Sequence, residues 1–130
     1  MKMKKISNIY KKRAEERNGG AIWIVDGASV RREFYTDFVM GGHDGRYRFI
    51  PSHEVWIDNA LSLEEFEYTI EHELLERKLM VEDGLNYNDA HDRASHLEFE
   101  MRKSDFASAR AKEENSPEIE EGTWFVYGKE

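Results

Sequence analysis

The sequence predicts an α+β fold, in which a small antiparallel or mixed sheet packs against two consecutive antiparallel helices over residues 63–80 and 88–103. In the first half of the chain, short runs of β-branched and aromatic residues lie between glycine-containing turns, which is typical of strands. In the second half, apolar residues recur with the helical period of 3.6. With 130 residues and no cysteine, the chain is long enough to form one domain without disulfides.

Composition and charge divide the chain into four segments. The sequence has no apolar run long enough to span a membrane. Its basic N-terminus is not followed by the apolar stretch that is typical of a signal peptide. A net charge of −8 opposes binding to phosphate backbones, so we expect neither a nucleic-acid nor a membrane partner. The absence of cysteine favours the cytoplasm. We expect a basic arm (1–20), a single α+β domain (21–103), a charged linker (104–122) and a C-terminal strand (123–130).

The first predicted elements surround two glycine-containing turns. Residues 11–17 are charged and are expected to form a short helix that stops at Asn18-Gly19-Gly20. Residues 21–25 are apolar and predict a strand. Asp26-Gly27 is a strong hairpin signal, so residues 28–31 are expected to return as the second strand of a hairpin.

Two more strands are expected before the helices. Residues 40–45 read as a loop, and residues 46–50 then alternate polar with apolar side chains, as a half-buried strand does, until Pro51. Residues 54–58 predict a further strand. Ser62, followed three residues later by Glu65, predicts a capping box that starts the first long helix.

The first helix places three polar residues between two apolar stripes. At 100° per residue, His72, Glu73 and Glu76 fall between these stripes and should be partly buried. A buried carboxylate is costly unless it is paired or coordinated, so a partner is expected. The stripes comprise Leu63, Phe66, Ile70 and Leu74 on one side and Tyr68, Leu75 and Leu79 on the other.

The second helix offers a histidine to the first. Its inner face carries apolar residues, with His91 and Glu98 at the edge of that face and His96 on the solvated side. The short connection between the helices favours antiparallel neighbours, so His91 is expected to meet His72 and Glu76. The inner-face residues are Tyr87, Ala90, Ala94, Leu97 and Met101.

Two imidazoles and a carboxylate suit a zinc ion or another divalent metal, one per chain. Three ligands leave a fourth position for water. Glu98 either orients His91 or closes the site as a fourth ligand, which would make the metal structural. An alternative without metal is also open, because Arg77 lies near Glu73 and would neutralise a buried carboxylate.

The segment from His72 to Glu76, together with His91, resembles the zincin metallopeptidases, and among them the gluzincin-type arrangement. The resemblance assigns His72 as the first metal ligand and Glu73 as the general base. Glu76 stands where that family has its second histidine, and His91 stands where it has a downstream glutamate. The resemblance implies a peptidase-like hydrolase that acts on a peptide or protein.

The resemblance also implies an edge strand that holds an extended peptide, a place that Val55, Trp56 and Ile57 would fill. Contacts to the substrate or the transition state would come from the loops beside it, with His43 and Tyr87 among the candidates.

Residues 21–102 also resemble an uncharacterised family of small bacterial and phage proteins, a likeness that implies no activity. A non-catalytic function therefore stays open. In that alternative, a phage or bacterial accessory protein binds a partner, and the same residues hold a structural metal or an ion-pair network. The apolar C-terminal strand, residues 123–130, would add to the sheet or join two copies as a homodimer.

Overall fold

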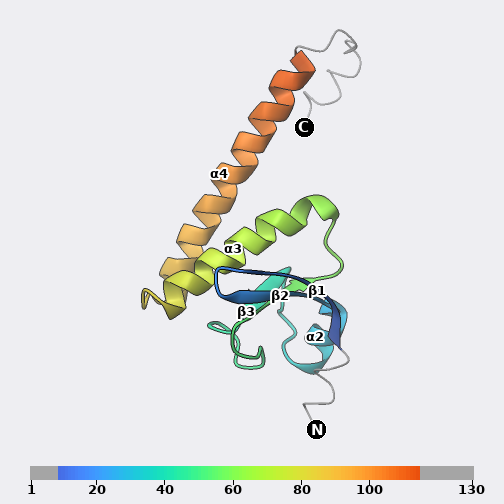
Figure 1. Ribbon diagram of the computed structural model, residues 1–130, viewed down its shortest axis with the longest axis vertical. Coiled ribbons are helices and arrows are strands. Elements are labelled where there is room, and N and C mark those ends of the chain that lie inside the picture. Colours follow the sequence, from blue (N-terminus) through green and yellow to red (C-terminus); the bar gives the residue numbers. More distant parts are fainter. Residues whose placement is uncertain (1–8, 115–130) are drawn as a thin grey trace. The chain divides into compact units, whose positions relative to one another are not determined.

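The computed structural model describes residues 9–114, and within them the fold is α+β, with a four-stranded mixed sheet and three helices (Figure 1). The chain forms two compact units that divide after Glu98. The first holds the sheet, two helices and the start of the last helix; the second continues that helix. The elements in order are β1 (Tyr10–Arg17), β2 (Gly20–Val25), α2 (Gly27–Glu33), β3 (Gly41–His43), β4 (Glu54–Asp58), α3 (Leu63–Val81) and α4 (Tyr87–Glu114).

The sheet has the strand order β1-β2-β4-β3. β2 and β4 are parallel, so the chain must cross over between them, and α2 and β3 lie in that crossover. β3 pairs with β4 in the antiparallel direction and forms one edge of the sheet. The prediction that Val55, Trp56 and Ile57 form the edge strand is therefore wrong, because Gly41–His43, expected as a loop, pairs outside them.

The helix expected at residues 11–17 is wrong, because these residues belong to the strand β1. Residues 10–17 form a strand that pairs antiparallel with β2. Asn18 and Gly19 join the two strands with φ angles of 52° and 79°, the left-handed angles of a tight hairpin turn. Pairing with β2 outweighs the helix propensity of the charged residues, and an edge strand tolerates exposed charge on its side chains.

The hairpin expected after β2 is wrong, because the chain forms the helix α2 there. Asp26 caps this helix by accepting a hydrogen bond from the Ser29 backbone N–H, at 3.4 Å, and one from the Ser29 hydroxyl, at 2.9 Å. Residues 28–31 are therefore helical. The strand expected at 46–50 is also absent, since residues 46 and 47 turn back to donate to the His43 carbonyl.

Two apolar clusters cover opposite faces of the sheet, because side chains alternate along β2 and β4. One cluster packs under α3 and comprises Ile22, Val55, Ile57, Ile70 and Leu74. The other packs on the opposite side and comprises Ile9, Val25, Val30, Phe38, Ile50 and Trp56, with aromatic residues around them. α3 thereby lies against β4 and the edge strand β3.

The two long helices begin where the sequence predicts. α3 starts after Ser62, although the Ser62 side chain makes no capping hydrogen bond, and Leu63 is 87% exposed rather than part of an apolar stripe. α4 extends to residue 114, so residues 104–114 of the expected linker are helical. Residues 115–122 and the expected C-terminal strand lie outside the described residues. No helix in the described part of the chain is long and apolar enough to cross a membrane.

We predict that Gly27→Ala lowers the free energy of unfolding by about 1–3 kcal/mol. A Cβ atom at Gly27 would lie 2.2–2.3 Å from the carboxyl atoms of Asp58, which is buried and bound to Arg31 at 2.9 Å. Helix propensity alone predicts the opposite, a gain of up to about 1 kcal/mol. Urea denaturation measures the sign, and Ala28→Gly at the exposed next position isolates propensity. A stabilised Gly27→Ala variant would show that the close approach is not required.

Candidate metal centre

α3 carries three buried polar residues on its inner side. His72, Glu73 and Glu76 are 8%, 8% and 3% exposed, in agreement with their expected place between two apolar stripes. All three line a pocket of about 470 Å³, to which β3, the loop after it and the first turns of α4 also contribute. The three polar side chains of α3 therefore share one pocket.

His72, Glu76 and His91 bring three ligand atoms together, as the sequence predicts. His72 Nε2 lies 3.3 Å from His91 Nδ1 and 3.3 Å from Glu76 Oε2, and His91 Nδ1 lies 2.8 Å from that same oxygen. Neighbouring ligand atoms around a tetrahedral zinc ion, with bonds of about 2.0–2.1 Å, lie about 3.3 Å apart. The three atoms therefore have the spacing and chemistry of a metal-binding set.

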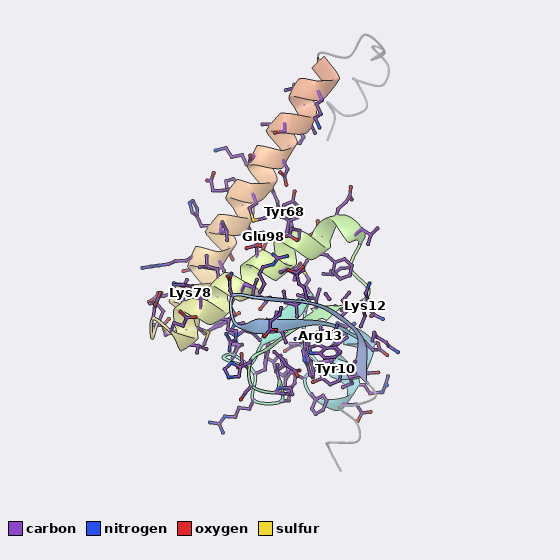
Figure 2. The ribbon with its side chains drawn as sticks, in the orientation of Figure 1. Tyr10, Lys12, Arg13, Tyr68, Lys78 and Glu98 are labelled. Atoms are coloured by element: carbon purple, nitrogen blue, oxygen red, sulfur yellow. The ribbon has the colours of Figure 1, made fainter. Side chains whose placement is uncertain are left out.

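Glu98 fixes the orientation of His72, not of His91 as expected. Its Oε1 atom lies 3.0 Å from His72 Nδ1, whereas Nε2 is the ring nitrogen that lies near Glu76 and His91. Figure 2 labels Glu98 on α4. If His72 carries its proton on Nδ1 and donates it to Glu98, the Nε2 lone pair points toward Glu76 and His91. Glu98 thus supports a ligand from behind, and its position does not fit a fourth ligand.

His43 supports Glu76 in the same way, a role that the sequence did not suggest. It lies on β3, is 0% exposed and is not among the residues that line the pocket. The Gly45 backbone N–H donates to Nδ1 at 3.1 Å, so a neutral His43 carries its proton on Nε2. That proton is donated to Glu76 Oε1 at 2.8 Å, which leaves Oε2 for the centre.

His43 also belongs to a second group of ligand types, with Glu73 and Glu76. The proton on its Nε2 makes this group less suitable for a metal than His72, Glu76 and His91. The substrate contact expected of His43 is likewise not seen, because the ring is buried behind Glu76.

Gly41 lets α3 approach the edge strand closely enough to place Glu73. A Cβ atom at Gly41 would lie 2.9 Å from the Trp56 carbonyl oxygen, 3.1 Å from Thr69 Cγ2 and 3.3 Å from Glu73 Cγ. Any side chain there would push the helix away from the strand. The closely spaced glycines around His43 are the one sequence signal that could have indicated a packed strand in place of a loop.

The two carboxylates on α3 have opposite protonation states. Burial alone would raise the pKa of Glu76, but hydrogen bonds with His43, His72 and His91 hold that pKa well below its usual range. Burial and the negative charge of Glu76 raise the pKa of Glu73 to about 8. Burial opposes charge on His72, but the hydrogen bond to Glu76 and the negative charges of the neighbouring carboxylates together raise the pKa of His72. At neutral pH, Glu76 is an anion beside a neutral acid.

Tyr87 was expected to contact a substrate, and Arg77 was expected to neutralise a buried carboxylate. The Tyr87 ring stacks on His91 with ring centroids 5.3 Å apart, and its hydroxyl lies 3.5 Å from His91 Nδ1, so Tyr87 reaches the pocket as expected. Burial raises the pKa of Tyr87, which keeps the hydroxyl protonated. Arg77 binds Asp44 at 2.5 and 3.2 Å. Its charge is therefore directed to Asp44 and not to Glu73 or Glu76.

Comparisons with protein-family models, with curated proteins and with solved structures found no match to this chain.

We predict that the metal-free protein becomes less stable as the pH rises from about 5 to 8. The folded pKa of Glu73, about 8, lies above its ordinary value of 4.5, so in this window the native state keeps a proton that the unfolded chain has lost. One such proton lowers the free energy of unfolding by at most about 1.4 kcal/mol per pH unit. The raised pKa of His72 acts in the same direction above 6.5.

Urea denaturation of chelator-treated protein at four pH values between 5 and 8 measures this slope. Glu73→Gln, which cannot ionise, should remove most of it, whereas Glu64→Gln, at an exposed position of the same helix, should not. Equal slopes in the native protein and in Glu73→Gln would contradict a neutral buried Glu73.

Proposed function

We propose that this chain is a metal-dependent hydrolase of peptide bonds, with zinc or another divalent ion held by His72, Glu76 and His91 and with Glu73 as general base. The observation that carries the proposal is the convergence of three ligand atoms within 3.3 Å of one another at the wall of an open pocket. The likeness to gluzincin-type peptidases is a prediction that agrees with this assignment.

The donor set supports a catalytic ion. Catalytic zinc sites use ligand sets of this kind, with two imidazole nitrogens and one carboxylate oxygen. Three protein ligands leave a further position for water or substrate. When bound, such an ion lowers the pKa of coordinated water toward neutrality. Two of the three ligands are already oriented by hydrogen bonds, His72 by Glu98 and Glu76 by His43. Pre-oriented ligands reduce the reorganisation needed to bind an ion.

Glu73 and Tyr87 supply the remaining functions. Glu73 is buried at the wall of the pocket beside His72, where a carboxylate is placed to accept a proton from water and later return it. A Glu73 oxygen lies within 4.8 Å of a ligand atom of Glu76. The protonated hydroxyl of Tyr87, beside His91, is placed to donate a hydrogen bond to negative charge that develops on a substrate oxygen.

β3 borders the pocket at one edge of the sheet. It has β4 on one side, and Gly41 lines the pocket directly beside Glu73. All three residues of β3 are buried, so in this proposal the peptide enters the pocket beside the strand and does not extend the sheet.

A second candidate function is a non-catalytic domain that binds a protein partner. Within residues 9–114, each fully buried side-chain nitrogen or oxygen has a hydrogen-bond partner. The cluster around Glu76 is therefore satisfied by protons alone, as an internal polar network would be. This candidate shares the residues of the first but needs no metal.

We predict that the full chain, purified without a His-tag or chelator, contains about one divalent ion per molecule. His72→Ala and His91→Ala should both lose it, because each removes one of three ligands. Elemental analysis measures the content, and the shift of the melting temperature on adding zinc measures binding independently.

His96→Ala is the matched control, since it removes an exposed histidine of α4 and should retain the metal. A protein with no bound metal and no thermal shift with zinc would contradict the hydrolase and favour the polar network.

We further predict that zinc-loaded protein cleaves peptides, and that Glu73→Gln lowers the rate by a factor of about 10²–10⁴ while it retains the metal, because the variant cannot accept a proton. Cleavage of a mixed peptide library, followed by mass spectrometry, measures the activity. Glu64→Gln controls for the loss of one acidic residue. Equal rates in Glu73→Gln and in the native protein would exclude Glu73 as the base.

A further inference from the structure

One cationic side chain, Arg46, lines a pocket whose other charged or titratable residues are acidic groups, histidines and tyrosines. It lies three residues after the end of β3, in the turn whose backbone N–H groups donate to the His43 carbonyl. Asp37, Glu73, Glu76 and Glu98 line the same pocket, so the charge of Arg46 is an exception within an acidic site.

Two aromatic rings hold the Arg46 guanidinium near the metal centre. Its central carbon lies 4.1 Å from the ring centroid of Tyr87 and 5.2 Å from that of Tyr47. Tyr87 in turn stacks on His91. A guanidinium over an aromatic face is attracted by the ring and loses part of its freedom. Arg46 also bonds to the Tyr87 side chain, and the other N–H groups of its five-donor fork stay available.

Arg46 has no carboxylate partner in the part of the chain that the structure describes, although acidic residues outnumber basic ones by 27 to 19 in the sequence. Arg77 on α3 and Arg17 on β1 differ in this respect. Arg77 is bound to Asp44, and Arg17 is bound to Glu67. An oriented, exposed guanidinium beside a ligand pocket, without an internal anion, is suited to bind an anion from outside.

We propose that Arg46 binds a carboxylate of the ligand, so that this pocket prefers peptides with a free carboxylate one or two residues from the group that lies at the metal centre. The inference rests on the proposed function for the position of the peptide, but the carboxylate site itself requires only Arg46 and the two tyrosines. A planar carboxylate matches the guanidinium fork with two parallel hydrogen bonds. The carboxylate would come either from the C-terminus of a peptide or from an acidic side chain.

Isothermal titration calorimetry with three short peptides tests the proposal. The probes are N-acetyl-Gly-Gly-Phe with a free C-terminus, the same peptide as its C-terminal amide, and the amide with Asp in place of the second Gly. They are titrated into the full chain with Glu73→Gln, to prevent cleavage, after zinc addition and again after chelation. We expect the free acid to bind at least about tenfold more tightly than the amide, as a charge-assisted bidentate pair predicts.

Variants at position 46 assign the preference. Arg46→Gln should reduce it to less than about twofold, and Arg46→Lys should retain part of it, because the charge remains without the fork. Arg48→Gln, which removes an exposed arginine outside the pocket lining, should leave it unchanged. An Asp-containing amide that binds as tightly as the free acid would show that a side-chain carboxylate is accepted; weak binding of that amide would identify the C-terminal carboxylate.

The outcomes separate this inference from the proposed function, because metal content is measured on the same samples. Zinc-loaded protein that binds the acid and the amide equally, or binds neither, overturns the carboxylate site and leaves the hydrolase standing. A preference that persists in Arg46→Gln also overturns it. A chain that takes up no zinc but still prefers the acid through Arg46 overturns the hydrolase and supports the carboxylate site.

Discussion

The charge of Glu76 is the constraint on which the rest of the centre depends. A carboxylate that is 3% exposed must be compensated, since a buried charge left without its partner costs about 3–5 kcal/mol. Compensation comes from three elements: His43 on β3, His72 on α3 itself and His91 on α4. The edge strand and the second helix are thereby fixed against α3 through one side chain, in addition to apolar packing.

The same anion determines what Glu73 can do. Glu73 precedes Glu76 by three residues on one helix, yet the imidazoles contact Glu76, while Glu73 experiences burial and repulsion. Two carboxylates in contrasting environments, one ionised and one neutral, form the pattern by which proteins separate a charged role from a proton-transfer role. The separation depends on Gly41, because only a residue without Cβ allows the helix to hold Glu73 against the strand.

The sequence predicted the helical part of this centre and not the part contributed by the sheet. The spacing from His72 to Glu76 and the position of His91 follow from local helical periodicity, which needs no knowledge of the rest of the fold. The role of His43 depends on pairing between β3 and β4, a contact between distant segments. The hairpin predicted at Asp26-Gly27 was wrong for a different reason. The same two residues suit a hairpin turn and a helix N-terminus, and the hydrogen bond from Ser29 to Asp26 favours the helix.

The supporting contacts of the centre are arranged asymmetrically, and this asymmetry favours a ligand site over a purely structural network. Glu76 is held from behind by His43, and His72 by Glu98. The side chain of His91 is 42% exposed, whereas that of Glu76 is 4% exposed, so the cluster opens toward the pocket along α4. A network that only stabilises the fold gains less from a solvent-facing member than from an enclosed one, because water screens the charge of the exposed group. Side chains oriented from the protein side and accessible from the pocket side are what binding an ion or a substrate requires.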